Sequence, residues 1–307
     1  MSQKLDWLSR IKGEVKYDEP LAAHTSFRIG GDADVFIAPS GIEDLKIILA
    51  HTQGRPPFIL GEGTNLLVKD GGIRGIVVSL KESFKTVGGV SFSKNREGRE
   101  IAVMKAGSGV KMSYLAKYAA RHSLTGMEGL AGIPGSLGGS LIMNAGAEGT
   151  EIGRVARSVT RVTADGEVQV LSREDLSFQY RKAVFPPGGG IIVEAEMELR
   201  RGDPLFIQEN MDRYLRKRSL RQPLSLPNAG SIFKNPPGGN AGRLIESAGL
   251  KGFGIGDAAV SRKHANFIVN KGNARACEVL ELIEHIQCVV KEKLGVELEK
   301  EIIVVGV

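Results

Sequence analysis

Two glycine-rich loops are the first places where this sequence could do chemistry. Gly61–Asn65 follows an apolar run that ends at Leu60, and it carries two small polar side chains. Gly129–Gly139 holds five glycines in eleven residues. Loops of this composition leave backbone N–H groups open to an anion such as a phosphate. Neither loop is a G-x-G-x-x-G or Walker A motif, so a tight turn and a glycine-packed core segment remain the respective alternatives.

The distance between these loops along the chain bears on the size of the ligand. They fall in different parts of the sequence, which favours a long ligand with several phosphates. A dinucleotide such as FAD meets that demand better than a mononucleotide does. The residues alone therefore favour a dinucleotide without requiring one.

Three side chains could act on a substrate, although each has an ordinary structural explanation. Arg181 precedes the Phe185–Pro187 turn, and a lone arginine is most often a surface residue. Ser231 has no histidine near it in the sequence, so a Ser-His pair has no local support. Glu301 begins the apolar segment Ile302–Val305, where its carboxyl could have a raised pKa or simply be solvated.

The composition is typical of a soluble globular protein, with 42% apolar and 25% charged residues. The net charge of +6 allows nucleic acid or a small polyanion such as a nucleotide as partner. A single tryptophan, five tyrosines and the lack of a known binding motif argue against nucleic acid. The five histidines form neither an H-E-x-x-H motif nor a Cys/His cluster, so we expect no metal site.

The two cysteines indicate a reducing compartment. Cys277 and Cys288 are separated by 11 positions in a helical pattern, or about 16 Å along a helix axis. A disulfide needs Cα atoms within about 7 Å, so the helix excludes this bridge. With no signal peptide or long apolar run, we predict a cytoplasmic protein that does not enter the membrane.

Apolar periodicity predicts a mixture of strands and helices. We expect strands at Asp34–Pro39, Pro57–Leu60, Ile76–Leu80, Glu100–Ala106, Ser158–Ala164, Glu167–Leu171, Gly190–Arg200 and Ala265–Asn270, with a buried-type strand at Glu301–Val305. We expect helices at Glu43–His51, Val110–His122, Pro204–Leu220, Ala241–Ala248 and Ala274–Leu294. Asp165-Gly166 signals a hairpin, while Gly249 and Gly295 signal helix ends. The pattern predicts an α+β protein with three parts, residues 1–80, 81–203 and 204–307.

A series of short motifs carries a resemblance to a known family. The motifs are His24–Gly31, Gly61–Leu67, Ile133–Gly139, Asn144–Gly146, Tyr180-Arg181, Gly230–Pro236 and Leu298–Glu301. In this order and at these spacings, from about residue 20 to 306, the chain resembles the UDP-N-acetylenolpyruvoylglucosamine reductases, also called UDP-N-acetylmuramate dehydrogenases. The short spacing between Arg181 and Ser231 resembles the compact type II form of the family.

The resemblance implies a fold and a reaction. The fold is α+β, of the vanillyl-alcohol-oxidase type, with two FAD-binding subdomains (1–80 and 81–203) and a substrate-binding domain (204–307). The reaction is reduction of UDP-N-acetylglucosamine enolpyruvate to UDP-N-acetylmuramate, a cytoplasmic step of peptidoglycan precursor synthesis. Hydride passes from NADPH to FAD and then to the vinyl carbon of the substrate.

The resemblance also assigns roles to residues. Arg181 and Glu301 match the groups that act on the charge developing at the substrate carboxylate, and Ser231 matches the proton donor. The segments that match the FAD site contribute Gly61, Glu62, Gly63, Thr64, Asn65, Leu66, Ile133, Pro134, Gly135, Ser136, Gly138, Gly139, Asn144, Ala145 and Gly146. Candidates for the substrate are Tyr180, Arg221, Lys234 and Asn235.

Another flavin oxidoreductase of the same fold, such as a sugar oxidase, is the main alternative. That fold often carries its flavin covalently on a histidine or cysteine. Cys277 and Cys288 lie in the third predicted part, away from the glycine loops. We therefore expect non-covalent FAD, with NADPH as co-substrate and a UDP-sugar as substrate.

Overall fold

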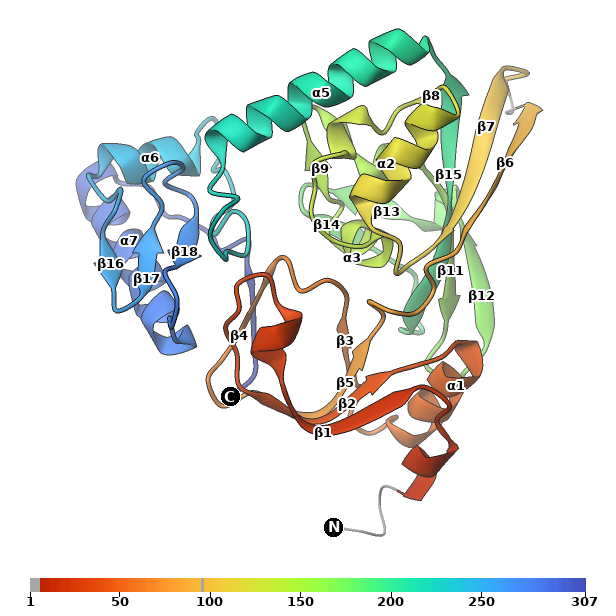
Figure 1. Cartoon of the computed structure of the whole chain (residues 1–307), viewed down its shortest axis with the longest axis horizontal. Coiled ribbons are helices and arrows are strands. Elements are labelled where there is room, and N and C mark those ends of the chain that lie inside the picture. The colour runs from red at the N-terminus through yellow and green to blue at the C-terminus, as the bar shows by residue number, and fades with distance from the viewer. Residues whose placement is uncertain (1–5, 95–96) are drawn as a thin grey trace. The chain divides into compact units, whose positions relative to one another are not determined.

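The computed structural model describes residues 6–94 and 97–307, which divide into two compact units (Figure 1). Unit 1 comprises the chain up to Lys16, Phe36–Gly61 and Ile76–Lys217, and unit 2 comprises Tyr17–Val35, Glu62–Gly75 and Arg218–Val307. The chain passes between the units within β1 (Glu14–Pro20), β2 (Asp32–Ala38), β5 (Ile73–Ser79) and α5 (Pro204–Arg221), and also between Gly61 and Glu62. The division into three parts at residues 80 and 203 stays a prediction.

The main sheet of unit 1 has the strand order β12-β11-β15-β7-β6, and β8 also pairs with β15. Its strands are β6 (Val87–Lys94), β7 (Glu100–Gly107), β8 (Leu124–Thr125), β11 (Ala156–Val162), β12 (Val168–Ser172) and β15 (Ile191–Arg201). Along β15, Ala195, Met197 and Leu199 are buried while Glu194, Glu196 and Glu198 alternate with them. This period of two places apolar side chains on one face and carboxylates on the other.

Helices cover the apolar face of this sheet (Figure 1). The covering helices include α2 (Met112–Arg121), α3 (Leu137–Ile142) and α4 (Ile152–Val155). The other short helical elements of unit 1 are η2 (Asp6–Arg10), α1 (Ile42–His51), η4 (Glu128–Leu130) and η5 (Arg173–Asp175). Met112, Leu115, Ala116 and Ala119 form the buried stripe of α2 at helical spacing. The same core includes Leu137 and Leu141 of α3, so the packing of α2 and α3 fixes where the second glycine loop lies.

Short strands complete unit 1 and its crossings to unit 2. A second sheet has the strand order β1-β2-β5-β3, where β3 is Phe58–Leu60. Two hairpins are also present: β9 (Gly146–Ala147) pairs with β10 (Thr150–Glu151), and β13 (Ser177–Gln179) pairs with β14 (Lys182–Val184). Asp44 of α1 accepts hydrogen bonds from the backbone of Lys12, Gly13 and Ser40. Burial alone would raise the pKa of Asp44, but these bonds outweigh burial and lower it.

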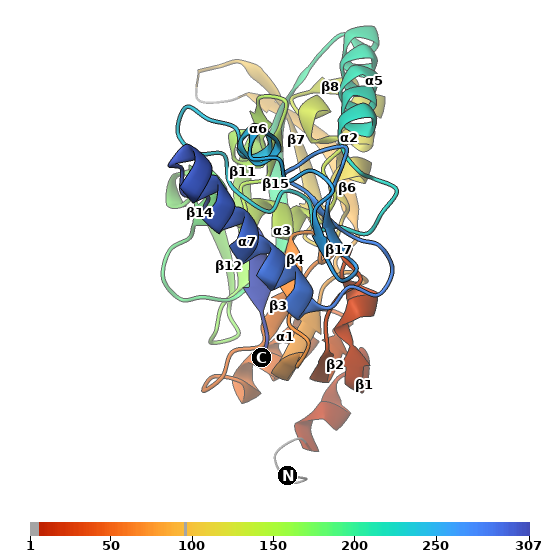
Figure 2. The same ribbon diagram turned by 90° about the vertical axis from the view of Figure 1, so that its left-hand side faces the viewer.

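Unit 2 is built around the long helix α7 (Ala276–Leu294), which Figure 2 shows along its whole length. The helix packs against β16 (Gly254–Ile255) and β17 (Ala258–Val260), which form a sheet with β18 (Ile268–Asn270). The other elements are η3 (Leu21–His24), β4 (Leu66–Val68), α6 (Ala241–Ser247) and β19 (Ile303–Val305), and β4 pairs with β19 in parallel. Gly295 ends α7 in the left-handed conformation, at φ 68°, as the sequence predicts.

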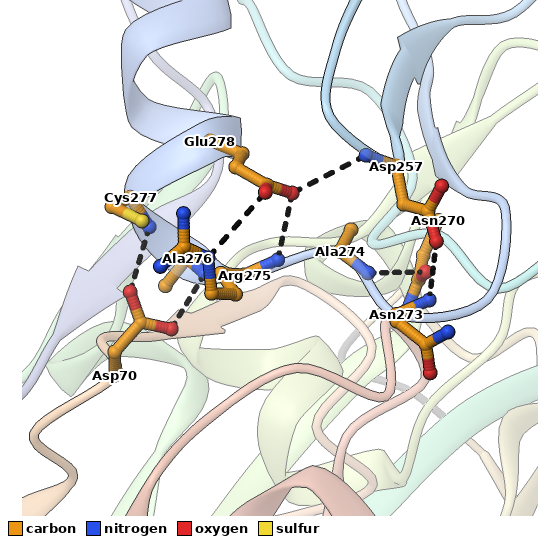
Figure 3. A network of polar contacts seen from close by, with 9 residues as sticks. All are labelled: Asp70, Asp257, Asn270, Asn273, Ala274, Arg275, Ala276, Cys277 and Glu278. Atoms are coloured by element: carbon orange, nitrogen blue, oxygen red, sulfur yellow. Dashed lines mark hydrogen bonds and ion pairs between the residues drawn. The ribbon is translucent and has the colours of Figure 1, made fainter.

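A polar network holds the start of α7 (Figure 3). The Asp70 carboxylate accepts hydrogen bonds from the backbone N–H groups of Ala276 (2.8 Å) and Cys277 (2.9 Å). Glu278 accepts from the backbone of Arg275 in a capping box. The network satisfies N–H groups that have no partner inside the helix, and it ties the loop after β4 to α7.

The predicted elements correspond to observed ones, with two kinds of difference. The helices α3 and α4 and the strands β1, β4, β6, β8, β9, β10, β13, β14, β16 and β17 were not predicted, because they are short, glycine-containing or largely exposed. The prediction of a buried-type strand at Glu301–Val305 was wrong in two respects. The strand begins at Ile303, and Ile303 is 41% exposed because β19 pairs only with β4 among the described strands.

Candidate active site

The two glycine loops predicted to bind the cofactor meet within unit 1. A Cβ atom added to Gly61 would lie 2.9 Å from Oγ of Ser136, so the backbone of one loop lies against the side chain of the other. Gly135 has a φ of +122°, which favours glycine. These contacts leave no room for larger side chains where the two loops meet. A ligand can approach backbone closely only where such side chains are absent.

Ser108 provides an independent test of whether this region suits a bound group. The backbone N–H of Gly138 donates to the carbonyl of Ser108 at 2.8 Å, and a Cβ on Gly138 would lie 3.0 Å from Cβ of Ser108. The Ser108 hydroxyl is buried and has no hydrogen-bond partner among the described residues. A buried hydroxyl without a partner is costly, so its place beside the loop fits a site completed by a polar ligand.

A third predicted cofactor segment, Asn144–Gly146, follows α3 directly. Asn144 is buried at a φ of +42°, and its side chain donates to Glu151 and to the Gln179 carbonyl and accepts from the backbone of Gly153. The backbone N–H of Ala145 donates to the Ser140 carbonyl at 2.8 Å. Asn144 therefore ties the segment after α3 to the β13–β14 hairpin.

That hairpin carries Arg181. Tyr180 and Arg181 form its two-residue turn, since Gln179 pairs with Lys182. Arg181 has a φ of +57°, which is uncommon for a residue other than glycine. Its Nη1 donates to the carbonyl of Gly146 at 3.3 Å, and its guanidinium carbon lies 5.1 Å from the centre of the Tyr180 ring. The structure thus brings the predicted catalytic arginine to the predicted cofactor segment.

The remainder of the first loop lies in unit 2. A Cβ on Gly63 would lie 2.3 Å from the carbonyl oxygen of His24, and Gly63 has a φ of +61°, so only glycine fits there. Leu66 is buried and begins β4, so its side chain belongs to the core. Asn65 donates through Nδ2 to the Glu301 carbonyl at 3.2 Å, while its own carbonyl accepts from Ile303 at 3.1 Å.

Ser231 and Glu301 are brought together by backbone pairing. The carbonyl of Ile232 accepts from the backbone N–H of Glu301 at 2.8 Å, and Phe233 forms a bridge with Lys300. Gly230, before the serine, has a φ of +77°, and its N–H donates to the Asn228 side chain at 3.0 Å. The half-buried Ser231 makes no side-chain hydrogen bond with the described residues, so its hydroxyl proton is available.

Two of the four predicted substrate residues are already engaged in unit 2. The Lys234 ammonium forms an ion pair with Glu299, and the Asn235 side-chain oxygen accepts from the backbone of Ala241 at the start of α6. Arg221, at the end of α5, is exposed. Burial lowers the pKa of His264, and the positive charges of Lys251 and, more weakly, Arg221 lower it further.

Sequence reasoning missed Asn266, the residue that holds the Ser231 segment in place. Its side chain accepts from the Phe233 N–H and donates to the Phe233 carbonyl, and its backbone carbonyl accepts from Ile232. Asn266 is 4% exposed. A polar residue inside the apolar run Ala265–Asn270 was the available signal, because buried amides are kept for their hydrogen bonds.

The part of the chain that the structure describes holds neither a metal-binding cluster nor a membrane-spanning helix. In residues 6–94 and 97–307, no group of three or more histidine, cysteine, aspartate or glutamate side chains could hold a metal ion. No helix in the same residues is both long and apolar enough to span a bilayer. Cys277 and Cys288 are exposed and free on α7.

Comparison with known proteins bears on the assembled site. A family model described as "UDP-N-acetylenolpyruvoylglucosamine reductase, C-terminal domain" matches residues 222–305, and one described as "FAD binding domain" matches residues 33–172. A UDP-N-acetylenolpyruvoylglucosamine reductase from Caldanaerobacter subterraneus subsp. tengcongensis is 44% identical over 297 residues, covering 96% of this chain and 95% of that protein. The chain belongs to the UDP-N-acetylenolpyruvoylglucosamine reductase family.

Other members of the family agree with this assignment. The reductase from Shouchella clausii is 43% identical over 302 residues, which cover 98% of this chain and 94% of that protein. The crystal structure of UDP-N-acetylenolpyruvylglucosamine reductase from Thermus caldophilus aligns with a TM-score of 0.79 at 37% identity, covering 96% of this chain and all of that one. The predicted α+β FAD-binding fold is confirmed, and the protein is an oxidoreductase with an FAD-binding domain.

Proposed function

We propose that this chain reduces UDP-N-acetylglucosamine enolpyruvate to UDP-N-acetylmuramate with NADPH, in the cytoplasm, for peptidoglycan precursor synthesis. One observation carries the proposal. In a member of this family, Ser231, with its available hydroxyl, lies beside Glu301 on paired backbone segments. A positioned hydroxyl donor is what protonation of the carbon next to a substrate carboxylate requires.

The residues around the glycine loops are those that would hold FAD. Backbone at Gly61–Asn65, the Ile133–Gly139 segment and Asn144–Gly146 would contact its phosphates and flavin, and no histidine or cysteine is among them. FAD, when bound, supplies a hydride acceptor for NADPH and a hydride donor for the vinyl carbon. Glu62, Thr64 and Ser136 offer polar side chains at the same loops.

Arg181 would stabilise the negative charge that develops on the substrate carboxylate. The guanidinium is always charged, and its planar fork matches a carboxylate in a bidentate manner. The strained turn conformation and the bond to Gly146 hold it in advance of the reaction. Charge stabilisation of this kind is usually the largest single contribution to such catalysis.

Ser231 would donate the proton to the carbon next to the substrate carboxylate. A serine hydroxyl is a weak acid, but a carbanion-like acceptor makes the transfer feasible. Glu301 can assist only if it is protonated or bridged, since two anions repel each other. Tyr180, Arg221, Lys234 and Asn235 would bind the nucleotide sugar, and Lys234 would have to leave Glu299 in order to do so.

The direct test is catalysis by the purified holoenzyme. NADPH oxidation should depend on the enolpyruvyl nucleotide and yield a product two hydrogens heavier. Acid precipitation should release the flavin into the supernatant, as expected for non-covalent FAD. A holoenzyme that reduces oxygen with a free sugar as electron donor, or a flavin that stays with the precipitate, would favour the sugar-oxidase alternative.

A further inference from the structure

A cavity lined with arginines lies in unit 1 at one end of β15. It has a volume of about 400 Å³, within the range of small-molecule sites. Four guanidinium groups line it, from Arg154, Arg157, Arg173 and Arg200, against the single carboxylate of Glu198. No residue predicted to bind FAD or the UDP-sugar lines it, so it is separate from the candidate active site.

The charges of this cavity are poorly compensated. Among the described residues, the side chains of Arg154, Arg200 and Glu198 make no hydrogen bond or ion pair. Arg157 approaches only Glu196, at 3.9 Å from Nε, and its buried Nη1 has no hydrogen-bond partner in the described chain. The four arginines and Glu198 together carry a net formal charge of +3. Arg154, Arg173 and Arg200 are exposed and reach water, whereas the buried Nη1 of Arg157 lacks an acceptor, which is costly.

Arg173 is already oriented at the cavity. Its Nη1 donates to the Leu176 carbonyl at 2.9 Å, and its guanidinium carbon lies 5.2 Å from the Phe178 ring centre. These contacts use one end of the guanidinium and fix its plane. An arginine held in this way binds an anion with less loss of side-chain freedom.

Arg161, elsewhere in unit 1, shows what a structural arginine of this chain is like. It is 4% exposed and donates to the Gln169 side chain and to the carbonyls of Pro186 and Pro187. Its guanidinium is thus fully used by the protein. The guanidinium groups of the cavity arginines are not fully used in this way, although Arg154, Arg157 and Arg200 come from neighbouring segments of the same sheet region.

We propose that this cavity binds a small organic molecule carrying two phosphate groups. A phosphate ester carries a charge of about −1.5 to −2 at pH 7, so two phosphates match the +3 of the lining better than one. Guanidinium groups bind phosphate oxygens in a bidentate manner. Val155, Ala156 and Leu199 give the cavity an apolar wall, which suits the organic part of the ligand.

Calorimetric titration of the FAD-loaded protein with inorganic pyrophosphate tests the charged part of this proposal. The double variant Arg154→Gln/Arg200→Gln should weaken one pyrophosphate-binding event by about a hundredfold or more, since it removes two charged hydrogen bonds. Arg121→Gln removes an exposed arginine of α2 outside the cavity and should change nothing. Pyrophosphate binding that is equal in all three proteins would overturn the proposal, whether or not the enzyme is active.

A gain of affinity provides the second arm, because misfolding cannot produce it. Glu198→Gln removes the only carboxylate of the lining and should tighten pyrophosphate binding by about two- to fivefold at low salt, with a smaller gain at high salt. Citrate, a carboxylate polyanion, should bind more weakly than pyrophosphate. Unchanged affinity in Glu198→Gln, or citrate binding at least tenfold tighter than pyrophosphate, would show that this is not a phosphate site.

Discussion

The predicted catalytic residues of the two units are held in different ways. In unit 2, Ser231 and Glu301 lie on paired backbone segments that Asn65 and Asn266 tie to their surroundings. In unit 1, Arg181 lies in the turn of a short hairpin, where its side chain donates to the Gly146 carbonyl and lies over the Tyr180 ring. Phe233 is 1% exposed whereas Tyr180 is 50% exposed.

This difference matches the tasks proposed for the two sets of residues. A proton donor must lie within hydrogen-bond reach of one carbon atom, so a fixed backbone position is useful. An arginine that binds a carboxylate acts through a long side chain, whose planar fork sets the geometry of the contact. The comparison predicts that variants in unit 2 separate chemistry from binding more cleanly than variants in unit 1 do.

The largest expected effect is that of Ser231→Ala. The variant should bind FAD and be reduced by NADPH nearly as fast as the parent, because the hydroxyl has no role in that half-reaction. Reoxidation by the enolpyruvyl nucleotide should slow by about 10² or more, the scale of a lost general acid. Stopped-flow absorbance measures the two half-reactions separately.

Ser225→Ala is the matched control, since Ser225 is an exposed serine of the preceding loop. It should leave both half-reactions unchanged. If both half-reactions slow together in Ser231→Ala, the serine is structural and the proton comes from another group. If neither slows, Ser231 is not the donor.

Arg181→Lys should have the next largest effect. Lysine keeps the charge but loses the bidentate fork, and a charged hydrogen bond contributes about 1.5–3 kcal/mol, which corresponds to about tenfold or more in rate. Turnover should fall more than nucleotide affinity, because the contact tightens as charge develops. Steady-state kinetics with binding titrations checks this, and unchanged turnover would place Arg181 outside the site.

Substituting one glycine in each unit, both from the predicted cofactor loops, compares the two units by the free energy of unfolding. Gly63→Ala, in unit 2, should destabilise the protein by about 1–3 kcal/mol, because of its positive φ and the close His24 carbonyl. Gly139→Ala, in unit 1, meets only Ser136 Oγ at 3.7 Å and lies inside α3, so it should not destabilise the FAD-free protein and should stabilise it by up to about 1 kcal/mol. Denaturant unfolding without FAD measures both, and equal stabilities would contradict the close packing of Gly63 against the His24 carbonyl.

The smallest effect concerns the cap of α7. Burial alone would raise the pKa of Asp70, but hydrogen bonds from the backbone of Ala276 and Cys277, with the charge of Arg275, outweigh it and lower the pKa. The cap therefore stabilises above the ordinary pKa of 3.8, and its contribution disappears as the pH falls through the lower pKa of the folded state.

Asp70→Ala should cost about 0.5–2 kcal/mol at pH 7 and less at acidic pH. Unfolding curves measured from pH 7 down to pH 3 test this difference. Glu284→Ala, an exposed change on the same helix, should cost much less at neutral pH. A cost for Asp70→Ala that does not depend on pH would show that the carboxylate charge is not what caps the helix.

The sequence by itself determined the elements with strong local signals. The helices α2, α5 and α7 show a helical period of apolar residues, and Gly295 marks the end of α7. These signals lie in neighbouring residues of the sequence, and they predicted the three helices to within two residues at either end. Motif order was enough to identify the family, because a series of spaced segments is specific even when each segment is not. The roles of Arg181, Ser231 and Glu301 remain predictions from that resemblance.

Only the tertiary structure decided which distant segments meet. Asn65, Ser231 and Glu301 are far apart in the sequence, and backbone hydrogen bonds, which any residue except proline can donate, bring them together. For the same reason no local pattern indicates that Asp70 caps a helix more than two hundred residues away, or that Arg154, Arg157, Arg173 and Arg200 share a cavity. Pairing and capping depend on geometry between elements, whereas local periodicity reports only which face of an element is apolar.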